Sequence, residues 1–396
     1  MAAPVEAVVR LLPGREKPAR EGHPWIFSGA VAGVGGEPSA GDTVRVEDAR
    51  GGFLGWGHYH PDSRIRVRIL ERRPDVRVDE DWWSGRLAAA IARRRKLLAD
   101  DAGACRLVFS ESDLLPGLVV DRYRDLLVLQ VHTPGAEGMR AMTLECLRLL
   151  LAPGRIVDRS DEEHRRLEGL APAVPDAASP APLEIREDGL RFNIDPVAGQ
   201  KTGFYIDQRL NRPLVAAWAS GRRVLDVFCY TGAFSAHAAR AGAASLTLID
   251  SSAEALAAAA RHLELNGFGA VPREARRGNA FAELRRLRDE GRSFDLVILD
   301  PPRLAPTRSQ AAKAARAYKD ANLLAMKLLA PEGILATFSC SGGIEPAHFR
   351  EIVRWAALDA GRDVQLLQKL GQPPDHPVRL SFPESEYLKG LICRVL

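Results

Sequence analysis

The chain lacks three features that would place it in a simple class. No segment of its 396 residues is both long and apolar enough to cross a membrane, and residues 1–20 lack the apolar core and small-residue cleavage site of a secretory signal. The five cysteines are odd in number and form no CxxC or CxxxC pair. We therefore expect neither a disulfide framework nor a zinc knuckle, and a reducing, cytoplasmic setting fits best.

The chain also has little excess charge of either sign. Lys and Arg together number 55 and Asp and Glu 51, which gives a net charge of +4. This balance excludes a strongly basic nucleic-acid coat protein. It is compatible with an RNA enzyme that gathers its arginines on one face, although it does not demonstrate one. The length predicts two or three domains with ample material for a core.

Residues 1–75 have the pattern of a small β domain. The segment 64–70 alternates strictly with period two, which separates its apolar and basic side chains onto opposite faces of a strand. The apolar face holds Ile65, Val67 and Ile69, and the basic face holds Arg64, Arg66 and Arg68. The three arginines form either an ordinary solvated face or a ladder that faces phosphate groups.

Residues 76–190 are expected to form a second, α+β domain. A helix is predicted over 82–100, a hairpin over 118–131 and a further helix over 139–151. Residues 171–182 are rich in Pro and Ala and form the best linker candidate of the chain.

Residues 191–396 change to alternating strands and helices. Strands are predicted at 224–228, 245–250, 296–300 and 334–338, and helices at 233–241, 252–266 and 310–329. This βαβαβ spacing predicts a doubly wound parallel sheet, so the fold class is a Rossmann-like α/β domain preceded by a β domain and an α+β domain.

The ends of the first two strands carry features that suit S-adenosylmethionine. Asp226 is followed by a turn with one glycine, Gly232, where a dinucleotide-binding GxGxxG fingerprint would have two. Asp250 ends the second strand, where an acid can accept hydrogen bonds from a ribose diol. Asn279, beside Gly278, can frame an adenine edge. The alternative is a Rossmann-like domain that binds another nucleotide.

Residues 200–209, Gln-Lys-Thr-Gly-Phe-Tyr-Ile-Asp-Gln-Arg, precede the first of these strands. They mix aromatic, acidic, amide and cationic side chains in a way that a solvated loop would rarely need. We expect this stretch to cap the cofactor, and a simple hinge between domains is the alternative.

An acid and a thiol follow the next two strands. Asp300 leads into Pro301-Pro302, and Cys340 lies between two serines just before Gly342-Gly343. Because open α/β sheets bind ligands at the carboxyl ends of their strands, both groups are expected in one crevice. The polar, flexible setting of Cys340 favours an accessible thiol over a buried packing residue. Cys229, inside the cofactor turn, is expected to pack.

Such a pair suits covalent attack on a pyrimidine. Carbon 5 of the ring is a poor nucleophile, but a thiolate that adds at C6 makes C5 enamine-like and able to accept a methyl group. The scheme needs a reactive cysteine, an acid near N3 of cytosine and a base for the C5 proton. Cys340 and Asp300 fit the first two roles, and the sequence does not identify the base.

Taken together, these motifs resemble the bacterial 23S rRNA cytosine-C5 methyltransferases of the RlmI type. The resemblance rests on residues 200–209, Tyr230-Thr231-Gly232-Ala233-Phe234, Asp300-Pro301-Pro302-Arg303 and Ser339-Cys340-Ser341. Residues 22–27 and the β segment after them are similar to that family's N-terminal PUA domain, an RNA-binding module, and residues 112–123 resemble its central domain. The likeness covers nearly the whole chain.

The resemblance implies S-adenosylmethionine as methyl donor and a cytosine of 23S rRNA, or of a large-subunit precursor, as target. It implies that Cys340 is the nucleophile and Asp300 the motif acid. The residues expected to bind the cofactor are Lys201, Phe204, Asp207, Asp226, Tyr230, Gly232, Asp250, Ser251, Asn279 and Asp300. Trp25, Phe27, Trp56 and Tyr59 either stack on RNA bases or form part of the β-domain core. A homodimer is expected only by analogy of fold.

Three other functions remain open on the sequence. Acid-Pro-Pro turns also serve methyl transfer to base nitrogens, which needs no thiol. Uridine C5 would use the same nucleophile as cytosine C5. The third is a PUA-bearing ribosome assembly factor whose methyltransferase fold has lost its chemistry, although Asp300 and Cys340 argue against it.

Overall fold

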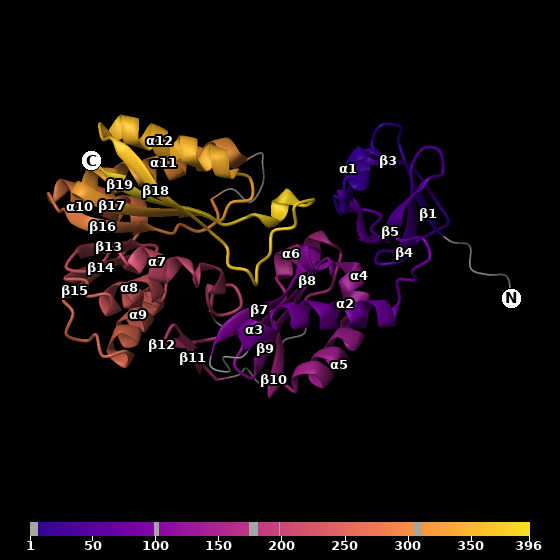
Figure 1. The fold of residues 1–396 in the computed structure, drawn as a ribbon, viewed down its shortest axis with the longest axis horizontal. Coiled ribbons are helices and arrows are strands. Elements are labelled where there is room, and N and C mark those ends of the chain that lie inside the picture. The colour runs from indigo at the N-terminus through magenta and orange to yellow at the C-terminus, as the bar shows by residue number, and fades with distance from the viewer. Residues whose placement is uncertain (1–6, 99–102, 174–180, 198, 305–309) are drawn as a thin grey trace. The chain divides into compact units, whose positions relative to one another are not determined.

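The computed structural model describes residues 7–98, 103–173, 181–197, 199–304 and 310–396 (Figure 1). The chain folds into two compact units. The first comprises Met1–Ala181, Asp195–Phe204 and Pro374–Ser385, and the second Pro182–Ile194, Tyr205–Pro373 and Glu386–Leu396. The three-domain division at about residues 75 and 190 stays a prediction. No helix within the described ranges is long and apolar enough to cross a membrane.

The amino-terminal part of the first unit forms a six-stranded sheet. Its order is β2 (Trp25–Phe27), β6 (Ile65–Glu71), β5 (Phe53–Tyr59), β4 (Thr43–Glu47), β1 (Val8–Leu11) and β3 (Val31–Gly35), with the short helix α1 (Lys17–Arg20). Val44, Val46, Val67 and Ile69 are buried in its core, as their alternation predicts. The expected β domain is confirmed.

The first unit also holds a four-stranded sheet and five helices. The sheet order is β10 (Arg155–Asp158), β9 (Leu126–Val131), β8 (Leu118–Tyr123) and β7 (Ala104–Phe109). The helices are α2 (Glu80–Arg93), α3 (Arg95–Leu98), α4 (Pro134–Gly138), α5 (Arg140–Leu151) and α6 (Glu162–Leu167). The hairpin predicted over 118–131 is confirmed.

The single helix predicted over 82–100 is wrong. The helix is interrupted at Arg94, between α2 and α3. The buried guanidinium of Arg94 donates two hydrogen bonds of 2.7 Å to the Asp113 carboxylate. The Asp113 carboxylate thus neutralises the buried guanidinium charge, and α3 begins at the next residue, Arg95. Residues 99 and 100 of the prediction lie outside the described residues, as does most of the linker predicted at 171–182.

A buried polar network ties the segment Asp195–Phe204 to β8 within the first unit. The Asp121 carboxylate is fully buried and accepts two hydrogen bonds from Arg106, at 2.7 and 2.8 Å. Thr202 donates to the same carboxylate at 2.6 Å, and the Tyr123 hydroxyl lies 2.8 Å from the Thr202 hydroxyl. Every member therefore has a partner, which buried polar groups require.

The second unit is built on a seven-stranded sheet. Its order is β15 (Arg273–Arg277), β14 (Ser245–Asp250), β13 (Arg223–Val227), β16 (Phe294–Leu299), β17 (Leu329–Ser339), β19 (Lys389–Val395) and β18 (Val364–Gly371). The pairings from β15 to β17 are parallel, whereas β19 is antiparallel to both of its neighbours. The doubly wound sheet is confirmed, and its last two strands were not predicted from the sequence.

Helices cover both faces of this sheet (Figure 1). The set α10 (Ala280–Asp289), α11 (Ala311–Leu328) and α12 (Pro346–Ala360) packs together, as does the set α7 (Asn211–Ala216), α8 (Ala233–Arg240) and α9 (Ala253–Leu265). A hairpin of β11 (Leu183–Glu187) and β12 (Leu190–Ile194) packs against α8 and α9 through its second strand. Short 3-10 turns lie at Ser28–Ala30, Ser110–Asp113, Ile206–Gln208 and Pro383–Ser385.

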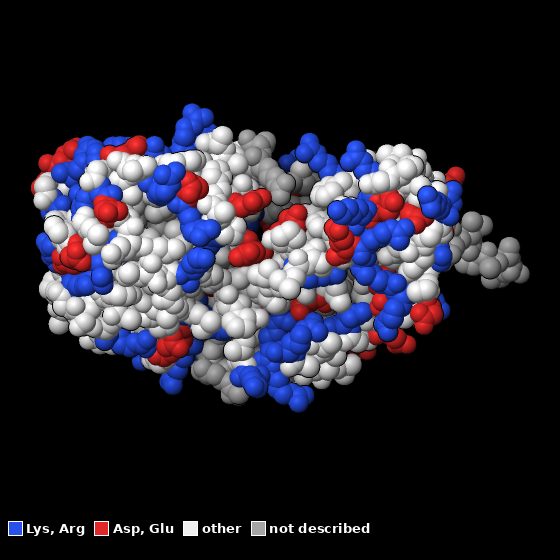
Figure 2. Space-filling model, turned by 45° about the horizontal axis from the view of Figure 1, so that its top comes forward, with Lys and Arg blue, Asp and Glu red and all other residues white. Residues whose placement is uncertain are grey.

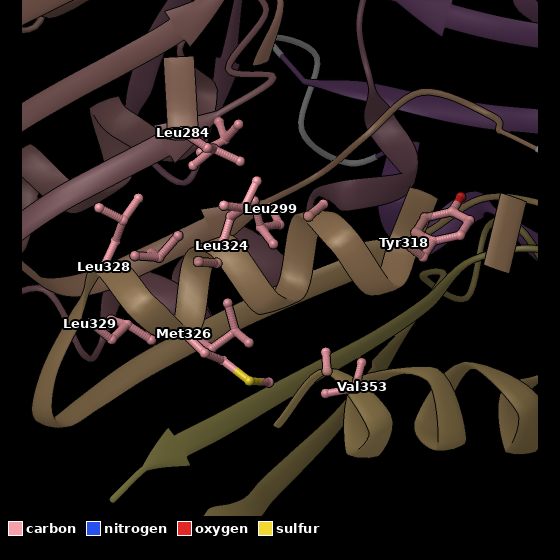
Figure 3. Close-up of a cluster of buried hydrophobic side chains, with 14 of the residues drawn as sticks. Leu284, Leu299, Tyr318, Leu324, Met326, Leu328, Leu329 and Val353 are labelled. Carbon is pink, nitrogen blue, oxygen red and sulfur yellow. The ribbon is translucent and has the colours of Figure 1, made fainter. Parts of the chain in front are cut away.

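The main core of the second unit lies under α10, α11 and α12 (Figure 3). Leu284 comes from α10, Leu324 and Leu328 from α11 and Leu299 from strand β16, and each is at most 1% exposed. Burying a leucine side chain contributes roughly 1.5–3 kcal/mol, so this cluster holds the strands that carry the site. Tyr318 also belongs to the cluster, and its ring lies at the amino-terminal part of α11.

We expect Asp121→Asn to lower the free energy of unfolding by roughly 3–5 kcal/mol, because it leaves the buried Arg106 guanidinium without a charged partner. Glu21→Gln breaks the exposed Lys17–Glu21 pair of the same unit and should cost less than about 1 kcal/mol. Urea unfolding curves would measure both. Equal losses would show that the buried network contributes no more than a surface pair.

Candidate active site

The site is formed where four neighbouring strands end. Strands β14, β13, β16 and β17 are adjacent and parallel, so their carboxyl ends meet at one edge of the sheet. Asp226 is the last but one residue of β13 and Asp250 is the last residue of β14, and Asp300 and Cys340 directly follow β16 and β17. The structure thus brings together four of the predicted site residues.

The turn after β13 is held in an unusual backbone conformation. Phe228, Tyr230 and Gly232 have φ angles of 63°, 49° and 74°. Only glycine fits the last position, because a Cβ atom there would lie 2.6 Å from the Cβ atom of Ala259 in α9. The Tyr230 amide donates to the Asp250 carboxylate at 2.9 Å, which joins the turn to the end of β14.

Asp226 lies beneath this turn. Its carboxyl group is buried, and its Oδ2 atom accepts a hydrogen bond from the Ser235 hydroxyl at 2.7 Å. Burial raises the pKa of Asp226 to about 6. Its Oδ1 atom has no hydrogen-bond partner among the residues that the structure describes. The side chain can therefore accept one more donor.

Asp250 is half-buried, and both of its carboxylate oxygens accept backbone amides. The second donor is Ser252, at 3.0 Å. Its carbonyl accepts the Gly278 amide at 3.0 Å, which brings the Gly278-Asn279 turn to the same strand end. Asn279 is exposed and caps α10 by accepting the Ala282 amide at 3.2 Å, and Ser251 is also exposed.

Asp300 and Cys340 come together as predicted. The Cys340 sulfur lies 3.9 Å from the Pro301 carbonyl, directly beside Asp300. Cys340 is half-buried, whereas Cys105, Cys146, Cys229 and Cys393 are buried. Burial raises the pKa of the Cys229 thiol well above its usual range, which agrees with a packing role for that residue. Cys340 is therefore the cysteine best placed to react.

Amide side chains orient the Asp300 carboxylate. Gln208 donates to Asp300 at 3.0 Å, and Asn211 donates to the Gln208 oxygen at 2.6 Å. Asn211 also donates to the Gly371 carbonyl at 3.0 Å. These hydrogen bonds hold the Asp300 carboxylate in one orientation. Gln208 lies in the stretch 200–209, so the sequence carried a signal for it, but its role as an orienting group was missed.

The Ser-Cys-Ser turn is held by groups that the sequence did not reveal. The Ser341 hydroxyl lies 2.9 Å from the Tyr318 hydroxyl and accepts the Leu304 amide at 3.1 Å. Lys389 donates from its Nζ atom to the Ser341 carbonyl at 2.7 Å. Tyr318 and Lys389 come from α11 and β19, and nothing in their local sequence distinguishes them from core residues.

The stretch 200–209 passes from the first compact unit into the second between Phe204 and Tyr205. In the second unit, the Tyr205 ring packs edge-on against Tyr230 with ring centres 5.4 Å apart, and Asp207 accepts the Tyr387 hydroxyl at 2.7 Å. Burial raises the pKa of Tyr205, so the phenol stays neutral and able to donate. The ring contact places Tyr205, a residue of the expected cap, against Tyr230 of the cofactor turn, whereas Asp207 is held by Tyr387.

Lys201 and Phe204 belong to the first unit. Lys201 is exposed with a φ of 54°, and Phe204 is buried. The Phe204 carbonyl accepts the Tyr123 hydroxyl at 3.4 Å. Contact of either residue with the cofactor stays a prediction, as does the role of the whole stretch as a cap.

For Arg68, neither the solvated face nor the phosphate-facing ladder is right. This side chain is buried and forms a bidentate pair with Glu168, at 2.7 and 3.1 Å, while Arg66 donates to the His60 carbonyl. Only Arg64 is exposed. Figure 2 shows Lys and Arg interspersed with Asp and Glu over much of the visible face, in line with the small net charge. Of the three arginines, Arg68 is buried, Arg66 is half-buried, and a role of Arg64 in contacting phosphate stays a prediction.

The four aromatic residues of the β domain differ in their surroundings. Tyr59 lies in the core, and the Trp25 indole donates to Glu111 at 2.8 Å. Trp56 is half-buried against Phe53. Phe27 is 48% exposed and is the one of the four most open to stacking.

The sequence matches two protein families. Residues 118–392 match the S-adenosylmethionine-dependent methyltransferases, and residues 9–72 match a PUA-like domain. "Ribosomal RNA large subunit methyltransferase I" of Shewanella denitrificans is 44% identical over 392 residues, which cover 98% of this chain and 99% of the relative. The protein of the same name from Tolumonas auensis is 42% identical, with 99% and 100% coverage.

The chain belongs to the ribosomal RNA large subunit methyltransferase I family. The resemblance drawn from the motifs is therefore confirmed, as are the class I methyltransferase fold, the PUA-like domain and S-adenosylmethionine as cofactor.

Solved structures agree with this fold. A protein of Streptococcus mutans assigned to the SAM-dependent methyltransferases has a TM-score of 0.83 at 19% identity, covering 98% of this chain and 100% of its own. A second methyltransferase structure with the same TM-score and identity contains SAH.

Asp226→Asn should change how stability depends on pH. In the unfolded chain Asp226 ionises near pH 4, and in the folded protein near pH 6. Between these values the folded protein binds more protons than the unfolded chain, so the free energy of unfolding falls as the pH rises. The variant should lose this component, which is roughly 3 kcal/mol.

Chemical denaturation of the cofactor-free protein at intervals from pH 4 to 7 would measure the effect. Asp295→Asn in the neighbouring strand β16 is the control: Arg223 lowers the pKa of Asp295, so the contribution of this carboxylate to stability changes only below about pH 4 and its removal should leave the slope between pH 4 and 7 unchanged. Identical profiles for wild type and Asp226→Asn would contradict the assignment.

Proposed function

We propose that the protein methylates C5 of a cytosine in 23S rRNA, or in a large-subunit precursor, through a covalent bond between Cys340 and C6. The observation that carries the proposal is the half-buried Cys340 thiol beside the Asp300-Pro301 turn, with 3.9 Å between its sulfur and the Pro301 carbonyl. The names of the relatives support ribosomal RNA as the substrate. The PUA-like domain supports RNA binding.

The side chains at the cofactor turn fit S-adenosylmethionine. The methionine amine and the ribose hydroxyls of this cofactor are hydrogen-bond donors, and the turn offers acceptors to match them. Asp226 has an Oδ1 atom without a partner among the described residues, and Asp250 has a half-buried carboxylate. We propose that these two acids, with Tyr230 and Gly232, hold the cofactor. It supplies the electrophilic methyl group when bound.

The chain's own residues carry the covalent steps. The Cys340 thiolate forms a bond to C6 of the ring, and Asp300 holds a proton at N3 so that electron density can collect at C5. Gln208 keeps the Asp300 carboxyl oriented for this contact through its 3.0 Å hydrogen bond. After C5 is methylated its proton passes to a general base, the C5–H electron pair restores the C5–C6 double bond, the C6–sulfur bond breaks and the thiolate is released.

The target base must leave its stack to reach Cys340, since ring carbons are shielded inside a helix. We therefore propose a single-stranded or loosely paired target whose base is extruded into the active site.

That two copies of this chain form a homodimer stays a prediction.

Replacing the proposed nucleophile tests the mechanism directly. Wild-type protein incubated with large-subunit rRNA and S-adenosylmethionine should form 5-methylcytosine, and Cys340→Ala should lower the rate at least roughly a thousandfold. Mass spectrometry of nuclease fragments would identify the product and its position. Cys146→Ala is the control, because that thiol is buried in α5 of the first unit and belongs to none of the proposed binding elements.

Each other product would point to a different function. Methylated purine, or equal methylation by Cys340→Ala, would contradict the thiol mechanism and favour transfer to a nitrogen. 5-Methyluridine would keep the mechanism and change the substrate. Failure to bind the cofactor would favour an assembly factor without methyltransferase activity.

The covalent bond itself can be trapped. RNA that carries 5-fluorocytosine at the target cannot lose a C5 proton, so the bond from sulfur to C6 should persist after methylation. We expect a denaturant-resistant protein–RNA complex with wild type and none with Cys340→Ala. A complex that forms equally in both would show that another residue attacks the ring.

A further inference from the structure

Lys389 is the first residue of β19 and lies opposite Ser339 in the antiparallel register. Its Nζ atom donates to the Ser341 carbonyl at 2.7 Å, and the residue is only 5% exposed. A nearly buried ammonium group thus touches the turn that carries Cys340.

The rest of β19 gives no reason for a cation at this place. Leu391, Ile392, Cys393 and Val395 are all buried, so the strand is otherwise an ordinary apolar sheet strand. Burying an ammonium group is costly unless other groups compensate for its lost hydration. The compensation here comes from one carbonyl and from the groups around the Ser-Cys-Ser turn.

Charged and titratable groups face Lys389 from several elements. Cys340 and Glu386 attract the ammonium, and Arg303 repels it. Burial is the main effect and lowers the pKa of Lys389 to about 8, while the interaction with Cys340 opposes that decrease. The attraction is mutual, so the ammonium that gains from a thiolate also stabilises that thiolate. Tyr205 interacts with both Cys340 and Asp300, so the surroundings of the thiol also include a neutral phenol and an acid.

We propose that Lys389 is a positioning residue for Cys340: its ammonium holds the Ser-Cys-Ser turn through the Ser341 carbonyl and stabilises the thiolate against the nearby Asp300. The inference deepens the proposed function, on which it rests, by naming the group that activates the nucleophile.

The pKa of a cysteine thiol explains why a positive charge near Cys340 would help catalysis. A free cysteine has a pKa near 8.5, so only a few per cent of it is thiolate at neutral pH, and only the thiolate attacks. Before it shares a proton with N3 of the bound base, an ionised Asp300 would decrease that fraction further, because a nearby negative charge disfavours a second one. A fixed positive charge beside the turn offsets Asp300 and keeps the thiolate populated. The released proton passes to solvent.

The test is the pH dependence of Cys340 alkylation by iodoacetamide in the intact protein without RNA or cofactor. We expect Lys389→Met to slow alkylation at pH 7 about tenfold and to move the alkylation profile toward higher pH. Lys389→Arg, which keeps the charge, should restore much of the rate. Lys369→Met is the matched control, because Lys369 is exposed on the neighbouring strand β18.

A purely structural role would leave the alkylation profile unmoved. Cys340→Ala supplies the background from the four buried cysteines, and thermal unfolding checks that each variant is folded. Lys389→Gln keeps a donor for the Ser341 carbonyl and removes only the charge, so it should behave like Lys389→Met. A wild-type profile in either folded neutral variant would overturn the proposal. Because alkylation needs no substrate, this outcome can be told apart from failure to methylate cytosine.

Discussion

The parallel alignment of β14, β13, β16 and β17 is the constraint on which the site depends. Parallel strands end at the same edge of a sheet, so residues far apart in the chain meet there once the hydrogen-bond register is set. Asp250, Asp226, Asp300 and Cys340 each belong to a different strand end. The leucine-rich core under α10, α11 and α12 holds these strands, and therefore the spacing of the reactive groups.

Polar contacts then convert that edge into a chemical site. Tyr230 joins the cofactor turn to Asp250, Gln208 orients Asp300, and Tyr318 and Lys389 hold the Ser-Cys-Ser turn. Each contact satisfies a group that burial would otherwise penalise, so stability and function rest on the same bonds. The cost of burying Asp226 and Lys389, seen in the opposite shifts of their pKa values, is concentrated at this site.

Some predictions failed because a one-dimensional pattern does not show what lies opposite a side chain. The alternation over 64–70 correctly separated apolar from basic residues, yet Arg68 turned out to pair with Glu168, a hundred residues away. The helix predicted over 82–100 continued the apolar periodicity through Arg94, whose partner Asp113 lies in a later turn. In both cases a distant acid decided the role of an arginine.

The sequence by itself determined the α/β fold, the cofactor and the acid and thiol at the strand ends, because these depend on local periodicity and on short motifs. Only the tertiary structure decided which groups surround them. Lys389 and Tyr387 reach the site from the last residues of the chain, and Tyr318 from the middle of a core helix. The positions of Lys389 and Tyr387 follow from the antiparallel insertion of β19 beside β17, a long-range pairing that no local pattern encodes.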